Sequence, residues 1–189
     1  MRSFIDDKEF KNIDFSAAGI EKAEYENCHF INCNFSNTDL SGISFSECSF
    51  DNCDLGMASL GKTAFRNADF KNSKLLGLRF ENCNPFLFAV KFENCQLNFS
   101  SFFKLNLKQT IFTKCLLQEV DFVEANLQGA RFNDCDLTAA QFENTNLEEA
   151  DFRTAYNYSI NPELNKIKKA KFSNAGIQGL LNKYDIEIE

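Results

Sequence analysis

Apolar residues recur at every fifth position along most of this chain. From Phe10 to Phe80 all fifteen positions at this spacing are apolar or aromatic, and after a slip of two residues fourteen more follow from Leu87 to Phe152. An α-helix repeats every 3.6 residues and a strand every two, so neither would gather these side chains on one face. The pattern predicts that each five-residue unit forms one side of a coil, with its central residue pointing inward.

A second position is also restricted. Two residues before each central residue, Ala, Cys, Ser or Thr occupies 21 of the 29 units, as expected for an inward position where the large central ring leaves little room. Every cysteine falls in this phase, and we interpret the thiols as small apolar core residues. Stacked thiols with identical inward directions suit neither a disulfide nor a tetrahedral metal site. The eight cysteines are Cys28, Cys33, Cys48, Cys53, Cys83, Cys95, Cys115 and Cys135.

The units have a recognisable form. Residues 68–72 (Ala-Asp-Phe-Lys-Asn), 125–129 (Ala-Asn-Leu-Gln-Gly) and 150–154 (Ala-Asp-Phe-Arg-Thr) each hold a small residue, Asp or Asn, a central Phe or Leu and two further residues. This pattern resembles the pentapeptide-repeat family over about residues 8–152. The resemblance implies an all-β solenoid, a right-handed, four-sided (quadrilateral) β-helix with four units per coil.

The order of Phe and Leu supports a coil of twenty residues independently. From Phe92 onward the central residues alternate strictly between the two types, so such a coil collects phenylalanines on two opposite faces and leucines on the other two. One face is predicted to hold Phe92, Phe112, Phe132 and Phe152, and the opposite face Phe102, Phe122 and Phe142.

The chain divides into two parts on this pattern. Residues 1–152 are predicted to form the β-helix, with a two-residue break near residues 81–87, and residues 153–189 a last irregular coil followed by a short helix and strand cap. Pro85 is expected at or near an inward position, where it cannot donate to a strand ladder, so a bulge or small loop is predicted. The break is interpreted as a tolerated insertion, with a functional protrusion as the alternative.

The C-terminal segment carries an apolar stripe. Phe172 lies twenty residues after Phe152, which predicts the last coil, and a helix capped by Ser173 or Asn174 follows, with residues 185–189 alternating like a strand. This module could plug the stack. Alternatively it pairs with a second copy, as the C-terminal modules of Qnr-type quinolone-resistance proteins do, which residues 179–188 resemble. The residues expected at that dimer contact are Ile177, Leu180, Leu181, Tyr184, Ile186 and Ile188.

Acidic residues outnumber basic ones by 27 to 20, which argues against direct binding to nucleic acid or to an anionic membrane. The first residues show no apolar signal segment, and no run of about 18 apolar residues occurs, so a soluble cytoplasmic protein is expected. The excess of acid is concentrated between residues 119 and 151, where Arg131 is the one basic residue. The candidate partner-binding residues are Glu119, Asp121, Glu124, Asp134, Asp136, Glu143, Glu148, Glu149 and Asp151. The alternative interpretation is a solvated surface that keeps the molecule soluble.

No catalytic constellation is apparent in the sequence. His29 is the one histidine and is expected to project outward, and nothing in the sequence places a Ser or Cys beside it. No GxxxxGK[ST] or GxGxxG motif occurs, and carboxylate pairs on so short-sided a coil would lack a cleft. We therefore expect no enzymatic activity, no cofactor and no metal.

Two functions remain open at this stage. The resemblance implies a dimeric DNA mimic that binds a type II topoisomerase, either gyrase or topoisomerase IV, and modulates it or protects it from drugs or toxins. Unlike the Gram-negative Qnr proteins, this chain has no long inserted loop, so a loopless subgroup is the nearer comparison. The alternative is a non-catalytic interaction scaffold with an unrelated protein partner.

Overall fold

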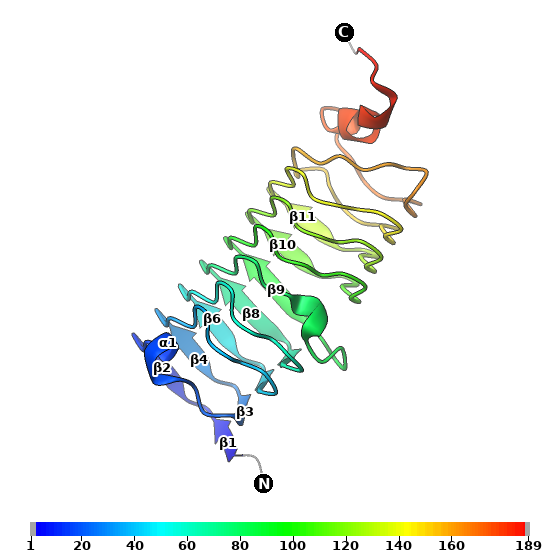
Figure 1. The fold of residues 1–189 in the computed structure, drawn as a ribbon. Coiled ribbons are helices and arrows are strands. Elements are labelled where there is room, and N and C mark those ends of the chain that lie inside the picture. Colours follow the sequence, from blue (N-terminus) through cyan, green and yellow to red (C-terminus); the bar gives the residue numbers. More distant parts are fainter. Residues whose placement is uncertain (1–2, 188–189) are drawn as a thin grey trace.

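The chain forms a rod of stacked coils with its two ends at opposite ends of the rod (Figure 1). The structure is a computed structural model that describes residues 3–187. All named strand pairings are parallel and build two sheets along the rod. The four-stranded sheet contains β1 (Ser3–Asp6), β3 (Ala23–Glu26), β5 (Ser44–Ser46) and β7 (Ala64–Arg66). The seven-stranded sheet contains β2 (Glu9–Lys11), β4 (His29–Ile31), β6 (Ser49–Asp51), β8 (Ala68–Lys71), β9 (Val90–Glu93), β10 (Ile111–Thr113) and β11 (Arg131–Asn133).

Within the described residues, helical structure is confined to single turns. Asp14 caps α1 (Phe15–Ala18) by accepting a 3.0 Å hydrogen bond from the backbone N–H of Ser16. The other turns are 3₁₀: η1 (Phe80–Asn82), η2 (Ile177–Leu180) and η3 (Asn182–Tyr184). Within residues 3–187, no helix has the length and apolar character that crossing a membrane requires.

The register of the sheets confirms the twenty-residue coil. Phe30 lies opposite Phe50 and Phe112 opposite Phe132, and isolated parallel bridges such as Asp39–Ser59 keep the same interval on the sides without strands. Four five-residue units therefore complete one coil. The four-sided β-helix predicted from the sequence is confirmed.

The corners of the coils explain why asparagine is frequent after the central residue. Asn32, Asn52 and Asn72 stand two residues after a central Phe with φ of 54°, 53° and 50°, in the left-handed region that Asn tolerates better than most residues. Their side chains continue the stacking, because Asn52 Nδ2 donates to Asn32 Oδ1 at 2.8 Å and Asn32 Nδ2 to Asn12 Oδ1 at 3.1 Å. Backbone conformation and side-chain hydrogen bonds thus agree at this position.

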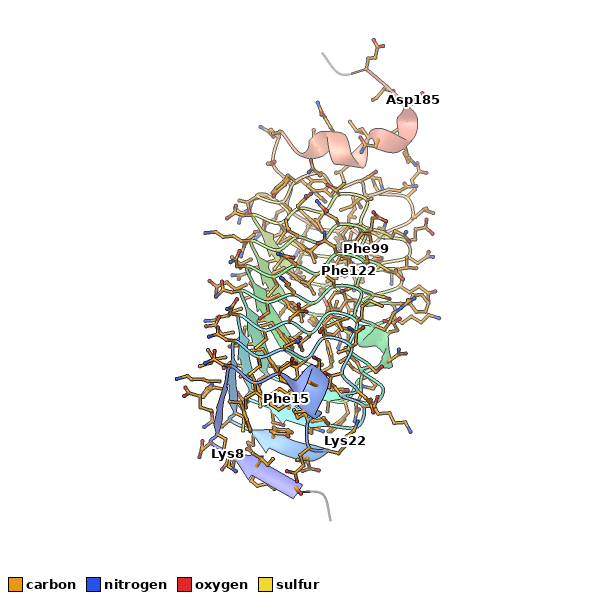
Figure 2. The ribbon with its side chains drawn as sticks, turned by 60° about the vertical axis from the view of Figure 1, so that its left-hand side comes forward. Lys8, Phe15, Lys22, Phe99, Phe122 and Asp185 are labelled. Carbon is orange, nitrogen blue, oxygen red and sulfur yellow. The ribbon has the colours of Figure 1, made fainter. Side chains whose placement is uncertain are left out.

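The core is a set of columns along the rod axis. Of the 29 central positions, 26 are buried and Phe10 and Ile20 are partly buried. Along the face of the rod that carries the seven-stranded sheet, and two coils beyond it, consecutive rings lie with centroids 4.7 to 5.4 Å apart and planes within 16° of parallel. This Phe column consists of Phe10, Phe30, Phe50, Phe70, Phe92, Phe112, Phe132, Phe152 and Phe172. Figure 2 shows these inward side chains filling the rod while polar side chains project from its outside.

All eight cysteines are buried and free. Burial is the main reason that the pKa of Cys48 and of Cys53 rises to about 12, so almost no thiolate exists at neutral pH. We expect Ellman's reagent to leave the native thiols unmodified for hours and to modify all eight in urea. A Gln96→Cys variant, which places a thiol at an exposed position, should react with one equivalent at once. Rapid modification of the native wild-type protein would contradict the inward assignment.

The break in the repeat is shorter than the sequence suggested. Asn84 N still donates to Thr63 O at 2.8 Å, and Ala89 N already donates to Phe65 O at 3.0 Å, so the irregular segment is confined to residues 85–88. Strand partners on either side of the break are 22 residues apart, as in Phe70–Phe92, and beyond it the interval is again twenty, as in Phe92–Phe112. The four-stranded sheet ends at β7, one coil before this loop, whereas the seven-stranded sheet continues past it.

Two expectations about the break are wrong. Leu87 was expected to be a central residue, but it is 63% exposed, and Pro85 is also exposed. Phe88 instead turns toward the core, with its ring 6.3 Å from that of Phe80. The extra residues precede Phe88, because the chain regains its register one residue later at Ala89, and this carries Leu87 to the outside.

The last coil is confirmed. The Phe172 ring stacks on that of Phe152 at 5.4 Å, and bridges join Asp136 to Tyr156 and Asp151 to Lys171. Beyond it, the expected short helix is present, but residues 177–184 form the 3₁₀ turns η2 and η3, so the α-helical spacing assumed for it is wrong. Gly179 disfavours an α-helix and allows close contact, because a Cβ there would lie 2.4 Å from the Tyr158 carbonyl oxygen.

The expected apolar stripe is therefore divided. Leu180 packs against the core and Leu181 is half-buried, while Ile177 and Tyr184 are each 50% exposed. A 3₁₀ turn holds three residues, so residues at the α-helical spacing no longer align. The expected strand is also absent from residues 185–187, where Ile186 is exposed. Ile188 lies outside the described residues.

Candidate protein-binding surface

Charge is distributed unevenly along the rod. Residues 112–151, two complete coils, hold nine acidic residues against Lys114 and Arg131, a net charge of −7. Residues 1–111 carry fourteen acids and twelve bases, and residues 152–189 carry four acids and six bases. At about 4.8 Å per coil, the two coils carry roughly one negative charge per 1.4 Å of axis, close to the value of about 1.7 Å for duplex DNA. We call these two coils the acidic belt.

The nine candidate carboxylates surround the belt and do not converge on one pocket. They differ in accessibility. Glu119, Glu124, Asp134, Glu143 and Glu149 are exposed. Asp121, Glu148 and Asp151 are half-buried, and Asp136 is buried.

Asp136 is already bound by the protein itself. Its carboxylate accepts hydrogen bonds from Gln118 Nε2 at 2.8 Å, Thr138 Oγ1 at 2.7 Å and Asn157 Nδ2 at 2.9 Å. Burial favours a higher pKa for Asp136, but these hydrogen bonds outweigh it and hold the pKa below its usual value. The side chain joins neighbouring coils and is the least accessible of the nine to a partner.

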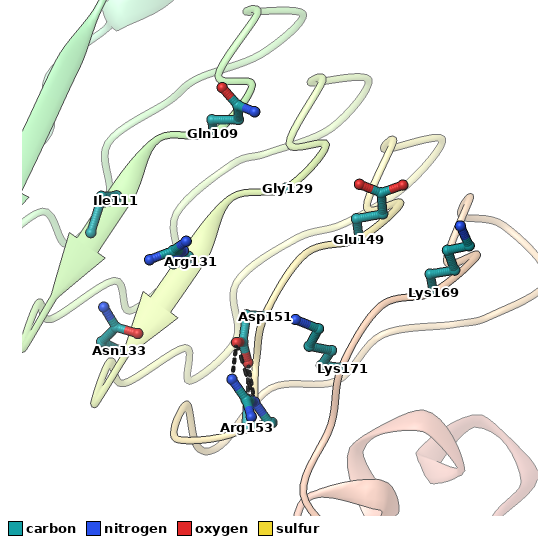
Figure 3. Close-up of a pocket in the computed structure, with 10 residues that line it drawn as sticks. All are labelled: Gln109, Ile111, Gly129, Arg131, Asn133, Glu149, Asp151, Arg153, Lys169 and Lys171. Atoms are coloured by element: carbon teal, nitrogen blue, oxygen red, sulfur yellow. Dashed lines mark hydrogen bonds and ion pairs between the residues drawn. The ribbon is translucent and has the colours of Figure 1, made fainter.

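Two further carboxylates have basic neighbours. Arg153 binds Asp151 with both Nε (2.9 Å) and Nη2 (2.6 Å), and these hydrogen bonds lower the pKa of Asp151. Glu124 lies 3.4 Å from Lys104 Nζ. Asp151 also belongs to a shallow groove that Arg131 and Lys171 line (Figure 3). The charge count over residues 119–151 included Arg131 but left out Lys104, Arg153 and Lys171, although the twenty-residue offset between Asp151 and Lys171 could have placed Lys171 there.

The side of the rod over Phe102, Phe122 and Phe142 keeps accessible acid. Glu119 and Glu143 are exposed, and Asp121 is half-buried and accepts hydrogen bonds from Ser101 Oγ (3.4 Å) and the backbone N–H of Val123 (2.8 Å). Among the residues that the structure describes, none of these three carboxylates forms an ion pair. This side is therefore the best supplied with carboxylates that a cationic partner could bind.

His29 has a neighbour that the sequence did not suggest. On the outer face of the seven-stranded sheet, its Nδ1 lies 2.8 Å from Ser49 Oγ. The backbone N–H groups of His29 and Ser49 donate to Lys8 and Cys28, within the coil stack, so neither is free to bind an oxyanion. The pair has the geometry of a surface hydrogen bond between adjacent strands.

Comparison with known proteins decides the family. The family model for the pentapeptide repeat region matches residues 23–85 and 85–161. The chain belongs to the pentapeptide-repeat family. A comparison with curated proteins gave no match.

Several solved pentapeptide-repeat structures are similar to this one. HetL, a protein involved in heterocyst differentiation regulation from the cyanobacterium Nostoc, is 18% identical with a TM-score of 0.61, covering 92% of this chain and 86% of its own. A trypsin-treated form of QnrB1, a plasmid-mediated fluoroquinolone resistance protein, is 18% identical with a TM-score of 0.48, covering 99% and 92%. At this identity the likeness to HetL shows the shared fold alone.

Proposed function

We propose that this pentapeptide-repeat protein is a non-catalytic DNA mimic that binds a type II topoisomerase, gyrase or topoisomerase IV, and modulates it or protects it from drugs or toxins. The supporting observation is the acidic belt, whose linear charge density is close to that of duplex DNA. Carboxylates held on a stiff rod would compete with phosphates for the same Lys and Arg side chains. Such a partner requires the protein to act in the cytoplasm.

The rigidity of the rod favours this role. Neighbouring coils are joined by backbone hydrogen bonds, and the central rings are packed in continuous columns. Binding would therefore order few backbone torsions, and little conformational entropy would be lost on association. A flexible acidic tail of equal charge would lose more.

A dimer formed through the C-terminal segments would have one acidic belt on each side of its junction. The C-terminal segment presents Ile177 and Tyr184 at 50% exposure and Ile186 at 55%, beyond the last coil. We propose that these side chains, with Leu180, Leu181 and Ile188, contact a second copy. The rod would then have a negative region on both sides of its middle.

Ile177→Asp is expected to weaken such a dimer at least a hundredfold, because the contact would bury an unpaired carboxylate. Sedimentation equilibrium measures the mass over a range of protein concentrations. Leu164→Asp is the matched control, since Leu164 is 49% exposed on the last coil and outside the proposed contact. An unchanged mass for Ile177→Asp at every concentration would remove dimerisation from the proposal.

Gyrase supercoiling tests the main proposal. Purified protein is added at two salt concentrations, with and without a quinolone. Inhibition or drug protection that weakens steeply with salt is the expected result, because ionic contacts to Lys and Arg are screened. An absence of any effect on gyrase and on topoisomerase IV at micromolar protein would reject it.

The second candidate is a scaffold for an unrelated protein. The observation that favours it is the internal engagement of Asp136, Asp151 and Glu124, which lowers the number of belt carboxylates free to imitate phosphates. In that case the belt keeps the rod soluble, and neither topoisomerase responds to the protein.

A further inference from the structure

A corner of the rod carries large apolar side chains where polar residues are usual. Met57 and Phe99 are 64% and 59% exposed, although each stands two residues after a buried central leucine. They lie in one column with Gly77 between them, as the cross-coil hydrogen bonds from Met57 N to Leu76 O and from Gly77 N to Asn98 O show. We call Met57, half-buried Leu76 and Phe99 the apolar ridge.

The backbone gives no reason for these residue types. Met57 has φ 58° and Phe99 φ 63°, in the left-handed region that large side chains adopt at a cost. Equivalent corners elsewhere hold Asn32, Asn52 or Gly129, which suit that conformation better. In the isolated protein, both the left-handed backbone conformation of Phe99 and the exposure of its ring to water thus cost free energy.

Gly77 shapes the ridge. A Cβ at this position would lie 2.6 Å from Met57 Sδ, so the absence of a side chain lets Met57 lie over the neighbouring coil. The thioether therefore lies over Gly77, in the coil between those of Met57 and Phe99. The three side chains of the ridge thus stand on successive coils.

The ridge adjoins the accessible acid of the belt. Phe99 N donates to Gln118 O, which places Glu119 at the same corner one coil above Phe99. On the adjoining side, Asp121 bridges Ser101 and Gln141. The apolar ridge is thus followed, one coil further along the rod, by accessible carboxylates.

Two residues further along each coil, a column formed by residues 103, 123 and 143 again places apolar side chains below an acidic one. Phe103 and Val123 are half-buried, and Glu143 is exposed in the coil above them. Lys104 Nζ lies 4.7 Å from the centroid of the Phe103 ring and 3.4 Å from Glu124, so the base at this edge is already engaged. We call the ridge with Phe103, Val123, Glu119, Asp121 and Glu143 the apolar–acidic patch. Figure 2 labels Phe99 and the core residue Phe122 beneath this side.

We infer that the apolar–acidic patch is the docking face for a segment of a cationic partner protein in which a hydrophobic or aromatic side chain is flanked by Lys or Arg. The three carboxylates select positive charge, and the ridge provides the apolar contact that desolvates it. Nucleic acid does not fit the patch, since its three carboxylates would repel phosphates. The inference deepens the proposed function and rests on its premise that the belt binds a cationic protein surface.

Two synthetic peptides of equal charge test this face directly. One alternates Lys and Arg with Phe and Leu, the other with Gly and Ser, and fluorescence anisotropy measures their affinity for the full-length protein. The apolar peptide is expected to bind about tenfold more tightly, the effect of burying one aromatic side chain in part. Amide shifts in ¹⁵N spectra should centre on residues 99, 119 and 123.

Phe99→Asn is expected to remove the tenfold preference without lowering the unfolding midpoint, because Asn suits the left-handed corner. Leu87→Asn is the matched control: Leu87 is 63% exposed with φ 57°, but lies in the loop of residues 85–88. Equal affinity for both peptides, shifts spread over all four sides, or an equal loss with Leu87→Asn would overturn the inference. A change in sedimentation mass with Phe99→Asn would overturn it in favour of a second copy as occupant.

The same variants separate this inference from the proposed function. If the peptides are discriminated but neither topoisomerase responds, the docking face stands and the DNA-mimic proposal fails. If gyrase responds equally to wild-type protein and Phe99→Asn, and the peptides bind equally, the DNA-mimic proposal stands and the docking face fails.

Discussion

Replacing Glu119, Glu143 and Glu149 together by lysine is expected to weaken binding to gyrase or topoisomerase IV at least a hundredfold at physiological salt. The three substitutions change the net charge of the acidic belt from −7 to −1. Each replaces an attraction to the partner's bases by a repulsion. All three residues are exposed and none is in an ion pair within residues 3–187, so the melting temperature should stay within about 2 °C of the wild type.

The measurement is the dissociation constant by surface plasmon resonance between 50 and 200 mM salt. The wild-type affinity should fall steeply over this range, and that of the variant much less. Glu21, Glu24 and Glu26 replaced by lysine form the matched control, because they are exposed and make the same charge change near the other end of the rod. Equal losses in both triple variants would show that net charge alone matters. Wild-type affinity in the belt variant would reject the DNA mimic.

Phe112→Ala is expected to lower the free energy of unfolding by about 4 kcal/mol. The ring is fully buried, stacks between those of Phe92 and Phe132 at 5.3 and 5.0 Å, and meets those of Phe102 and Phe122 edge-on. Its neighbours are held by strand pairing on both sides, so they cannot close the void. Urea unfolding monitored by circular dichroism measures the loss.

Two controls accompany this prediction. Leu117→Ala, in the same coil, removes a smaller buried side chain and should cost about 3 kcal/mol, whereas Phe99→Ala at the surface should change stability by less than about 0.5 kcal/mol. Because each coil contacts only its neighbours, the Phe112→Ala transition is also expected to broaden as the two halves of the rod uncouple. A loss below about 1 kcal/mol would show that the column rearranges around the void.

The regular coils were predictable because their cause is local and repeated. Each unit carries its own central residue and small inward residue, so the period of five and the alternation of Phe and Leu specify the faces without knowledge of distant contacts. Leu87 shows the limit of this reasoning. Leu87 satisfies the period. The position of a two-residue insertion, however, depends on which of several apolar residues returns to the core, and in the structure that residue is Phe88.

The C-terminal segment and the belt show two further limits. The helical spacing of Ile177, Leu180, Leu181 and Tyr184 was real, but Gly179 packs against Tyr158, and that contact favours 3₁₀ turns over an α-helix. For the belt, a linear count of charge could not reveal that Arg153 and Lys104 engage Asp151 and Glu124. The Lys104–Glu124 pair joins adjacent coils and the Arg153–Asp151 pair lies within one unit, and both depend on side-chain orientation, which composition does not encode.

Because the Phe column is unbroken, the length of the rod can change only in steps of one coil. The column passes the loop at residues 85–88 and still ends in register at Phe172, so the addition of a whole coil would leave it unbroken. Duplicating residues 112–131 would lengthen the rod by about 4.8 Å without changing which faces meet the partner. For a partner that contacts this protein at two sites along the rod, each inserted unit of twenty residues would increase the distance between the two sites by one coil. The number of coils alone could therefore determine which partner fits.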